Sequence, residues 1–533
     1  MAALDDAGER MDVSGIDNWK PARRALLVAA WGKGREHRDY LHPPLDLYRL
    51  KRSLDEVGIS NEVYDPNLSA DPHAGFLTAV RNARADIVGF STNHYSLPFD
   101  LSLAHHLYRN IGPHVRMVAG GIGCTESHEL ALRYAPPGLV VVRGEGDLVL
   151  PALCAASDPR SVPGLAWVQD GKIVTSEPQK PLSRNQFVGA ITGMDWEAIP
   201  FEDYWKIILR HHDPSMLIEQ NVNTIRVIVS SYCPRGCRFC SSTNIYRLAG
   251  FEGNQAVFRL TPTETLGILK RLIWAHPDVM NFFFHDDDFL WSAPWVKELC
   301  ALIADCRMEG SIPDYITFMA QGSVRNIPQV ASELASANFK LIGLGVESFS
   351  PKVLREFNKP QRPRHIHDAV DALLKAEITP YVNLILSSPD SKVDDLLITL
   401  RESIKLLRKG ASVAASVYTL AFPGAEMTAG ADEDRLVTYE EFPIEGTDLN
   451  IRMTDKILPR DTLLRAVLER SEMILADLDR EFFSGEGAFR SMLAPLTFHA
   501  ITRSLEESGV SVPDDIRKAM REYTVEPSGV ELP

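Results

Sequence analysis

Three of the seven cysteines lie within one stretch of eight residues that follows an apolar run. Cys233, Cys237 and Cys240 have the spacing C-x3-C-x2-C. Cysteine thiolates hold Fe–S clusters, and three thiolates leave one iron of a [4Fe-4S] cluster without a protein ligand. Because an open iron can bind and reduce a small cofactor, this loop predicts redox chemistry at a cluster.

Two other interpretations of the cysteine triplet are weaker. A structural zinc site takes four ligands, usually in paired C-x2–4-C blocks, and no second cysteine pair with that spacing exists. Three unrelated core cysteines are disfavoured, because Pro234 and Gly236 between them indicate a loop. The four other cysteines are scattered: Cys124, Cys154, Cys300 and Cys306. An odd, scattered set indicates no disulfide framework, so we expect a reducing cytoplasm, which an Fe–S cluster would need.

Length, charge and hydropathy bound the class of protein. The 533 residues suffice for several domains, and a composition of 45% hydrophobic and 24% charged residues is ordinary for a soluble α/β protein. A formal net charge of −15 argues against a nucleic-acid partner, which would require a basic surface. No window reaches about 18 uninterrupted apolar residues, so we expect no membrane span. Residues 1–22 lack the pattern of a secretory signal and are expected to form a disordered tail.

Residues 23–156 alternate short apolar runs with amphipathic segments. Strands are expected at 25–29, 61–64, 86–91, 115–118 and 139–142, with helices near 45–57, 74–83 and 101–110. This alternation predicts a doubly wound parallel sheet of the flavodoxin or Rossmann type. Ligands of such sheets bind beyond the carboxyl ends of the strands. Polar or glycine-rich segments follow the strands there, at 91–94, 120–121 and 144–146.

The rest of the chain divides into three further parts. Residues 157–215 are expected to be a linker with one hairpin, because Asp170-Gly171 separates two short alternating runs. In residues 216–426 candidate strands fall at 225–229, 279–284, 315–320, 340–344, 380–386 and 414–420. Six such units predict a partial (β/α)6 barrel with its site at the carboxyl ends of the strands. Strand signals then fade, so residues 427–533 are expected to form a small helical C-terminal domain.

The cysteine loop resembles the signature of the radical S-adenosylmethionine (SAM) enzymes, and later segments extend the resemblance. Residues 284–289, Phe-His-Asp-Asp-Asp-Phe, resemble a stretch of the cobalamin-linked members, where this strand end lies against the SAM amino group. Residues 343–348 resemble the family's G-x-E-S, whose Glu lies near the SAM ribose. The resemblance implies a [4Fe-4S] cluster on Cys233, Cys237 and Cys240. It implies SAM contacts at eight residues: Phe239, Asp286, Asp287, Gln321, Arg325, Glu347, Ser348 and Leu386.

The sequence departs from the family pattern after the fifth and sixth barrel strands. Ser387 stands where Gly is usual, next to the expected adenine contact, and Ala425 replaces a Thr. An aspartate run after a strand is also typical of a helix N-cap, so residues 286–288 taken alone would be interpreted as capping. Their position behind the cysteine loop favours a role in the site.

Residues 25–155 resemble the cobalamin-binding domain of the class B radical SAM enzymes. The match rests on segments 42–46, 63–65, 88–91, 118–121 and 143–147. It implies cobalamin contacts at eight residues: Ser91, Thr92, Asn93, Gly120, Gly121, Gly144, Glu145 and Gly146. The D-x-H-x-x-G motif of the better-known cobalamin domains is absent, since His94, His105 and His106 lack the flanking Asp and Gly. This fits the subset whose cobalt carries no His ligand, and it also fits a domain that has lost cobalamin.

The resemblance implies a cobalamin-dependent radical SAM methyltransferase that acts on an unactivated carbon of a small molecule, as in natural-product biosynthesis. It also implies an external electron donor such as flavodoxin or ferredoxin. Three alternatives stay open: a cobalamin-dependent rearrangement or cyclisation without methyl transfer, a cobalamin-free dehydratase or epimerase, and a sensor that is not an enzyme. Beyond the cluster ligands, no catalytic side chain and no substrate is predicted.

Overall fold

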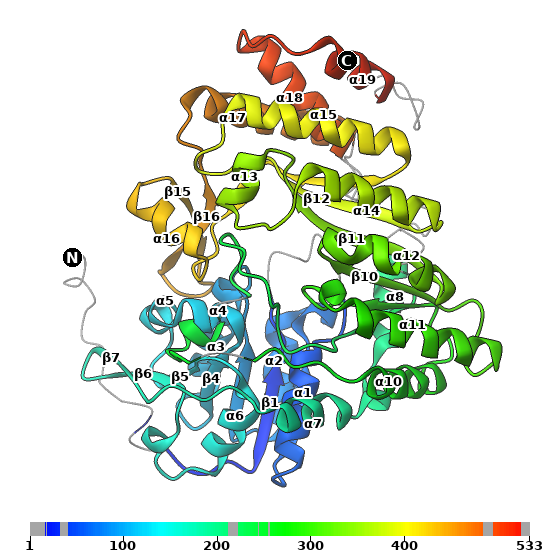
Figure 1. The fold of residues 1–533 in the computed structure, drawn as a ribbon. Coiled ribbons are helices and arrows are strands. Elements are labelled where there is room, and N and C mark those ends of the chain that lie inside the picture. Colours follow the sequence, from blue (N-terminus) through cyan, green and yellow to red (C-terminus); the bar gives the residue numbers. More distant parts are fainter. Residues whose placement is uncertain are drawn as a thin grey trace.

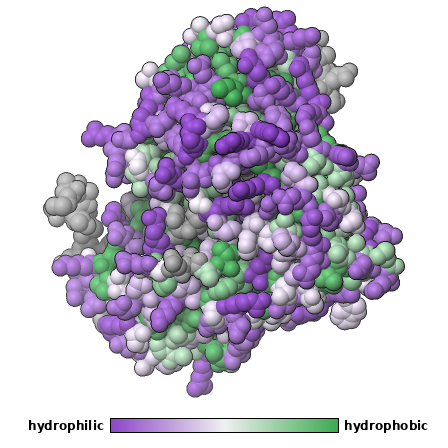
Figure 2. Space-filling model, viewed as in Figure 1, coloured by the Kyte–Doolittle hydropathy of each residue, from purple (hydrophilic) through white to green (hydrophobic). Residues whose placement is uncertain are grey.

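The computed structural model describes residues 16, 19–31, 41–211, 222–242, 245–253, 256–482 and 494–523. Two large sheets of mainly parallel strands dominate it, one from each half of the chain. In Figure 1 the first lies at the bottom and the second above it. In the described part of the chain, a small antiparallel sheet and four further helices, the first of them α16 (Glu426–Glu433), follow the second sheet. Among the described residues, no helix is both long and apolar enough to cross a membrane. On the face drawn in Figure 2, apolar patches are small and separated by hydrophilic residues.

The N-terminal sheet has seven strands in the order β2-β1-β3-β4-β5-β6-β7. Its strands are β1 (Arg24–Val28), β2 (Ser60–Tyr64), β3 (Ile87–Ser91), β4 (Arg116–Gly120), β5 (Leu139–Val142), β6 (Leu165–Gln169) and β7 (Lys172–Thr175). The first five pair in parallel, as the sequence predicts. Its helices are α1 (Leu45–Asp55), α2 (Pro72–Ala83), α3 (Leu97–Ile111), α4 (Gly121–Glu126), α5 (His128–Tyr134) and α6 (Gly146–Ala155). Each face of the sheet has its own apolar core, which explains why the inner strands β1, β3, β4 and β5 are mostly apolar.

The segment expected to be a linker is more ordered than the sequence suggests. Its hairpin, β6–β7, forms as expected, but β6 also pairs antiparallel with β5 and so extends the first sheet. Two helices follow, α7 (Arg184–Thr192) and α8 (Phe201–His211). Phe187, Trp196 and Phe201 are buried in the core of the second sheet. This segment therefore packs against both halves of the chain rather than spanning a gap.

Part of the expected disordered tail also packs on the N-terminal unit. Ile16 and Trp19 are buried, and the Trp19 indole donates a hydrogen bond to Leu153 O at 3.1 Å. Residues 1–15, 17 and 18 lie outside the described residues. The contacts of Trp19 could not be inferred from its acidic, apolar-poor surroundings in the sequence.

The second sheet has six parallel strands in chain order, from β8 at one edge to β13 at the other. Its strands are β8 (Thr224–Val227), β9 (Asn281–Phe284), β10 (Thr317–Gly322), β11 (Phe339–Glu347), β12 (Thr379–Ile385) and β13 (Ser412–Ser416). The helices α10 (Pro262–Ala275), α11 (Ala293–Met308), α12 (Ile327–Ser336), α14 (Pro363–Lys375) and α15 (Val393–Lys409) cover its outer face. Within the described residues β8 does not pair with β13, so the barrel is open, as predicted.

The C-terminal region is not wholly helical, which corrects the expectation from sequence. Helices α17 (Thr462–Phe482), α18 (Ala494–Glu507) and α19 (Asp514–Tyr523) are present. Before them, β15 (Val437–Pro443) and β16 (Asn450–Ile457) form an antiparallel hairpin, and β16 also pairs with β14 (Thr419–Leu420). The alternation in β16 buries Ile451 and Met453. Arg452 between these two residues, and Asp455 and Lys456 after them, obscure this short strand signal.

The β15–β16 hairpin fastens the C-terminal region to the N-terminal unit. Ile444 and Met453 belong to the core on one face of the first sheet, together with side chains of α2 and α3. The backbone N–H of Glu445 donates to Ser102 Oγ of α3 at 2.9 Å, and Arg109 donates to Gly446 O. In Figure 1 the hairpin lies directly against the helices of the N-terminal unit. The hairpin thus bridges the two halves of the molecule.

Because Ile444 is fully buried in that core, replacing Ile444 by Ala should destabilise the protein by about 2–5 kcal/mol. The effect is measurable as a lower midpoint of urea denaturation. Asp448→Ala is the matched control, since Asp448 is exposed in the same hairpin turn. Equal midpoints for the two variants would contradict the packing of the hairpin on the first sheet.

Candidate functional site

The cysteine loop begins at the carboxyl end of β8 and is fastened to two other strand ends and to Asn358, which follows the short helix Pro351–Glu356. Arg235 lies between two of its cysteines and pairs with Asp288 after β9, with Nε 2.7 Å from Oδ2. The same guanidinium donates to Ser323 Oγ after β10 at 2.8 Å. On the far side, Asn358 donates from Nδ2 to Gly236 O at 2.6 Å. These contacts fix the loop over the open end of the barrel.

The three thiols fit a cluster better than a single ion. Cys237 is buried, and Cys233 and Cys240 are half-buried on the same loop. Among the described residues no three metal-ligating side chains converge on one point, as a zinc ion would require. The irons of a cubane-shaped cluster are separate, so its cysteines need not converge. Burial raises the pKa of Cys233 to about 12 and raises that of Cys240 as well. A bound cation such as iron would therefore be needed to hold these groups as thiolates.

The three consecutive aspartates after β9 take three different positions. Asp286 is buried and accepts hydrogen bonds from Val229 N at 3.1 Å and Ser230 N at 2.6 Å. Asp288 is also buried and pairs with Arg235. Asp287 is the exposed member, although partial removal from water and its two neighbouring carboxyl groups raise its pKa to about 6. Asp286 and Asp288 thus hold the cysteine loop, and Asp287 is the carboxylate that faces outward.

Glu347 ends β11 beside the cysteine loop and is ion-paired. Its Oε1 lies 2.9 Å from Nζ of Lys359, and both side chains are almost buried. The Lys359 ammonium lies 5.7 Å from the centre of the Phe239 ring, which also packs against Phe357. The structure therefore brings Glu347, Phe239 and the cysteine loop together, and it adds Lys359, which carries no signal in the sequence.

The other predicted SAM contacts are spread more widely. Gln321 lies one residue before the end of β10, next to Gly343 of β11, and Leu386 is buried after β12. Arg325 is exposed in the turn after β10. Ser348 is buried and lies 3.0 Å from the Thr399 hydroxyl of α15, so it faces the helical layer instead of the cysteine loop. Their roles in SAM binding stay predictions.

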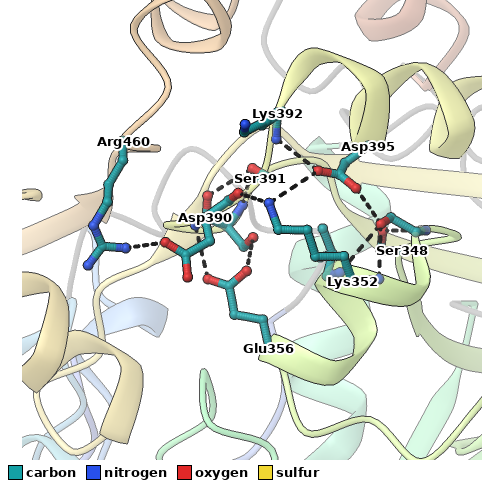
Figure 3. Close-up of polar contacts among 11 residues, drawn as sticks. Ser348, Lys352, Glu356, Asp390, Ser391, Lys392, Asp395 and Arg460 are labelled. Atoms are coloured by element: carbon teal, nitrogen blue, oxygen red, sulfur yellow. Dashed lines mark hydrogen bonds and ion pairs between the residues drawn. The ribbon is translucent and has the colours of Figure 1, made fainter.

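A polar network braces the loop that follows β12 (Figure 3). Glu356, at the end of α13 (Pro351–Glu356), accepts from Ser388 Oγ at 2.6 Å and from Asp390 N at 3.1 Å. Arg460 pairs with Asp390 from the other side. Lys352 of α13 bonds to Asp390 O and lies 3.8 Å from Asp395 of α15. This network fixes the shape of one strand-end loop of the barrel.

The N-terminal unit presents two interlocked loops at the carboxyl ends of β3 and β4. The Thr92 hydroxyl donates to Gly120 O at 2.8 Å and accepts from Cys124 N at 2.9 Å. Gly121 has a φ of +88°, and a Cβ there would lie 2.5 Å from Thr92 O. Only glycine allows this approach without displacing the backbone. Asn93 caps its own turn by accepting from Tyr95 N and Ser96 N at 2.9 Å.

The side chain of His94 is turned toward the C-terminal hairpin. Its Nε2 lies 2.8 Å from Thr454 O of β16, and burial lowers its pKa. The ring also packs edge-on against Phe422. His94 is thus held by the hairpin, in agreement with the missing D-x-H-x-x-G motif.

The third glycine-rich loop of the N-terminal unit contacts the cysteine-loop region directly. Glu145 accepts a hydrogen bond from the hydroxyl of Tyr246, in α9 (Ile245–Leu248), six residues after Cys240. Helix α4 also packs against α9, and burial raises the pKa of Glu126, at the end of α4, to about 7. Arg49 lies 3.7 Å from Glu145 and 2.7 Å from Asp147, which keeps these carboxylates compensated. The carboxyl-end loops of the two sheets therefore meet.

Comparisons with known proteins agree with both halves of this site. The family model described as "B12 binding domain" matches residues 35–154, and that described as "Radical SAM superfamily" matches residues 227–402. The uncharacterized methyltransferase PH0819 of Pyrococcus horikoshii is 26% identical over 345 residues, 63% of this chain and 67% of that protein. The anaerobic magnesium-protoporphyrin IX monomethyl ester cyclase of Rubrivivax gelatinosus is 28% identical over 150 residues, 26% of this chain and 24% of that protein.

Two solved structures share the fold over most of the chain. The radical SAM methyltransferase TsrM from Kitasatospora setae has a TM-score of 0.65 at 15% identity, and the match covers 94% of this chain and 98% of that one. The cobalamin-dependent SAM radical enzyme OxsB has a TM-score of 0.63 at 14% identity, covering 94% and 84%. The chain is a radical SAM enzyme with an N-terminal B12-binding domain, and it has the fold of the cobalamin-dependent radical SAM enzymes.

Proposed function

We propose that the protein is a cobalamin-dependent radical SAM methyltransferase that transfers a methyl group to an unactivated carbon of a small molecule. The observation that carries this proposal is the contact between the loops of the two sheets, in which Tyr246, close to the cysteine loop, bonds to Glu145 of the B12-binding domain. This contact supports a shared space between the carboxyl ends of the two sets of strands, where both cofactors would bind. The methyltransferase among the relatives supports the choice of reaction.

We assign cofactor-holding roles to the residues that the structure gathers at these strand ends. Cys233, Cys237 and Cys240 would hold the [4Fe-4S] cluster, and Asp287 and Glu347 are the nearby acids available to SAM. The cobalamin contacts would come from the loops that contain Ser91–Asn93, Gly120–Gly121 and Gly144–Gly146. When bound, the cluster and SAM supply a radical that removes a hydrogen atom, and cobalamin supplies the methyl group.

The protein's own residues would orient these groups and exclude water. Asp286 and Arg235 hold the cysteine loop, so the cluster ligands are fixed before any cofactor binds. Tyr246 closes the seam between the two units with its hydrogen bond to Glu145, beside the packing of α9 against α4. A closed seam would protect a radical from side reactions with solvent.

A second candidate is a cyclisation or rearrangement that uses both cofactors without methyl transfer. The similarity to a cyclase of Rubrivivax gelatinosus favours it, although only 26% of this chain is matched. A methyltransferase and a cyclase differ in the fate of SAM, because only methyl transfer converts SAM to S-adenosylhomocysteine.

The proposal includes an external one-electron donor such as flavodoxin or ferredoxin, a small-molecule substrate of natural-product type, and a reducing cytoplasm. All seven cysteines are free, which supports a reducing compartment. The net charge of −15 gives no basic surface for a nucleic-acid partner.

The decisive assay uses the anaerobic chain loaded with iron, sulfide and hydroxocobalamin, then given SAM and dithionite. We expect both 5′-deoxyadenosine and S-adenosylhomocysteine, with the second product dependent on cobalamin. 5′-Deoxyadenosine without cobalamin-dependent S-adenosylhomocysteine would favour the cyclisation candidate. If neither product forms, the proposed radical SAM chemistry is refuted.

Cys237→Ala should abolish the brown visible chromophore of the reconstituted protein, because the cluster would lose its buried ligand. Iron and sulfide content per chain measures the loss. Cys306→Ala is the control, since Cys306 is buried on α11 and should leave both contents unchanged. A full chromophore in the Cys237 variant would mean that this cysteine is no ligand.

Gly121→Ala should release cobalamin, because the new Cβ would displace Thr92 O and separate the loops after β3 and β4. Bound cobalamin per chain, read from the visible spectrum after gel filtration, is the measurement. Gly112→Ala is the matched control: Gly112 also has a positive φ, +79°, but a Cβ there meets nothing within 4 Å. Each change costs roughly 1–2 kcal/mol of backbone strain, so only the first should lower cobalamin retention. Equal retention would argue against cobalamin at these loops.

A further inference from the structure

Lys359 is a nearly buried cation at the cysteine loop that no motif marks. It follows α13 and lies 2.9 Å from Glu347 Oε1, with 13% of its side chain exposed. It also donates toward Gly345 O at 3.4 Å. Burial alone would lower the pKa of Lys359, but the Glu347 carboxylate raises it above its ordinary value. The ammonium therefore stays charged at neutral pH.

The backbone approaches the ion pair closely. A Cβ on Gly345 would lie 2.9 Å from Glu347 Oε1 and 3.0 Å from Lys359 Nζ, so any larger residue there would displace the ends of both side chains. Glu347 itself has a φ of +62°, a conformation that residues with a Cβ rarely adopt. Such strain persists only where the surroundings fix it, and it is often found at functional sites.

The segment that carries Lys359 is fastened to the cysteine loop on both sides of Cys237. Asn358, just before Lys359, donates from Nδ2 to Gly236 O at 2.6 Å. The backbone N–H of Arg238 donates to Phe357 O at 3.2 Å. The Lys359 ammonium lies 5.7 Å from the centre of the Phe239 ring, and Phe239 stands between Cys237 and Cys240. The ammonium therefore lies against the part of the loop that carries these two cysteines.

We propose that Lys359 is a positioning residue that raises the reduction potential of the cluster by holding a positive charge beside Cys237, with Glu347 as the counter-charge that limits the effect. This inference rests on the proposed [4Fe-4S] cluster. Reduction adds one electron, from the external donor, and so one negative charge to the cluster. Net charge near the sulfurs is one of the determinants of Fe–S potentials, and a fixed cation stabilises the reduced, more negative state.

A dye-mediated redox titration of the reconstituted cluster, followed by electron paramagnetic resonance without SAM, tests the proposal. Lys359→Met should lower the midpoint potential, and Glu347→Gln should raise it. The double variant should fall between the two, and Lys359→Arg should stay close to the unmodified protein. Lys352→Met is the control: this lysine belongs to α13 but bonds to Asp390 O on the loop after β12, and its change should leave the potential unmoved (Figure 3).

Opposite shifts of the midpoint potential in Lys359→Met and Glu347→Gln are the supporting result. Either substitution breaks the same ion pair, so a purely structural effect would shift the two potentials in the same direction. Shifts of the same sign, or none, at full iron content would overturn the proposal. If Lys359→Met fails to retain iron, Glu347→Gln decides alone: a higher potential supports the proposal, and an unchanged or lower one refutes it. Absence of any cluster in the unmodified protein would instead refute the proposed function.

Discussion

The buried carboxylate of Asp286 is the interaction on which the candidate site depends. It accepts from Val229 N, Ser230 N and the Ser230 hydroxyl, and so fixes the point at which the chain leaves β8 for the cysteine loop. An unpaired buried carboxylate would be very costly. Arg259 supplies the compensating charge, bonds to Phe289 O at 2.9 Å and stacks over Trp295. The cysteine loop therefore starts from a turn in which the buried carboxylate has both hydrogen-bond donors and a compensating charge.

The second constraint is the orientation of the two parallel sheets. The ligand-binding loops of a parallel sheet lie at the carboxyl ends of its strands, so two such sheets can share a cavity only if these ends face each other. Here the orientation is maintained at two places. Tyr246 and Glu145 join these ends directly, and the β15–β16 hairpin buries Ile444 in the core of the first sheet. The hairpin also holds His94 through Thr454 O. A strand pair outside both matched domains thus contributes to the geometry of the site.

The sequence predicts the two α/β units and their strand ends because buried parallel strands are short apolar runs and the cysteine spacing is specific. It does not distinguish the roles of Asp286, Asp287 and Asp288, because consecutive residues after a strand point in different directions, and which one stays exposed depends on tertiary contacts. Lys359 lacks any local signal, since its partner Glu347 is twelve residues away and on another element. The sequence does not indicate the hairpin, because few residues of β16 are apolar and polar or charged residues separate them.

Ser387 illustrates how a departure from a family pattern can be absorbed by packing. The resemblance placed Gly here, beside the expected adenine contact, so an added side chain could have blocked that edge. In the structure Ser387 is fully buried and its hydroxyl donates to Val417 O at 2.9 Å, while Ser387 O accepts from Thr419 Oγ1 at 2.7 Å. The extra atoms thus point into the contact between β12 and the chain after β13, where they satisfy a carbonyl. The Ser387 side chain therefore lies in the packed contact with residues 417–419, and it adds no side chain to the strand end that faces the cysteine loop.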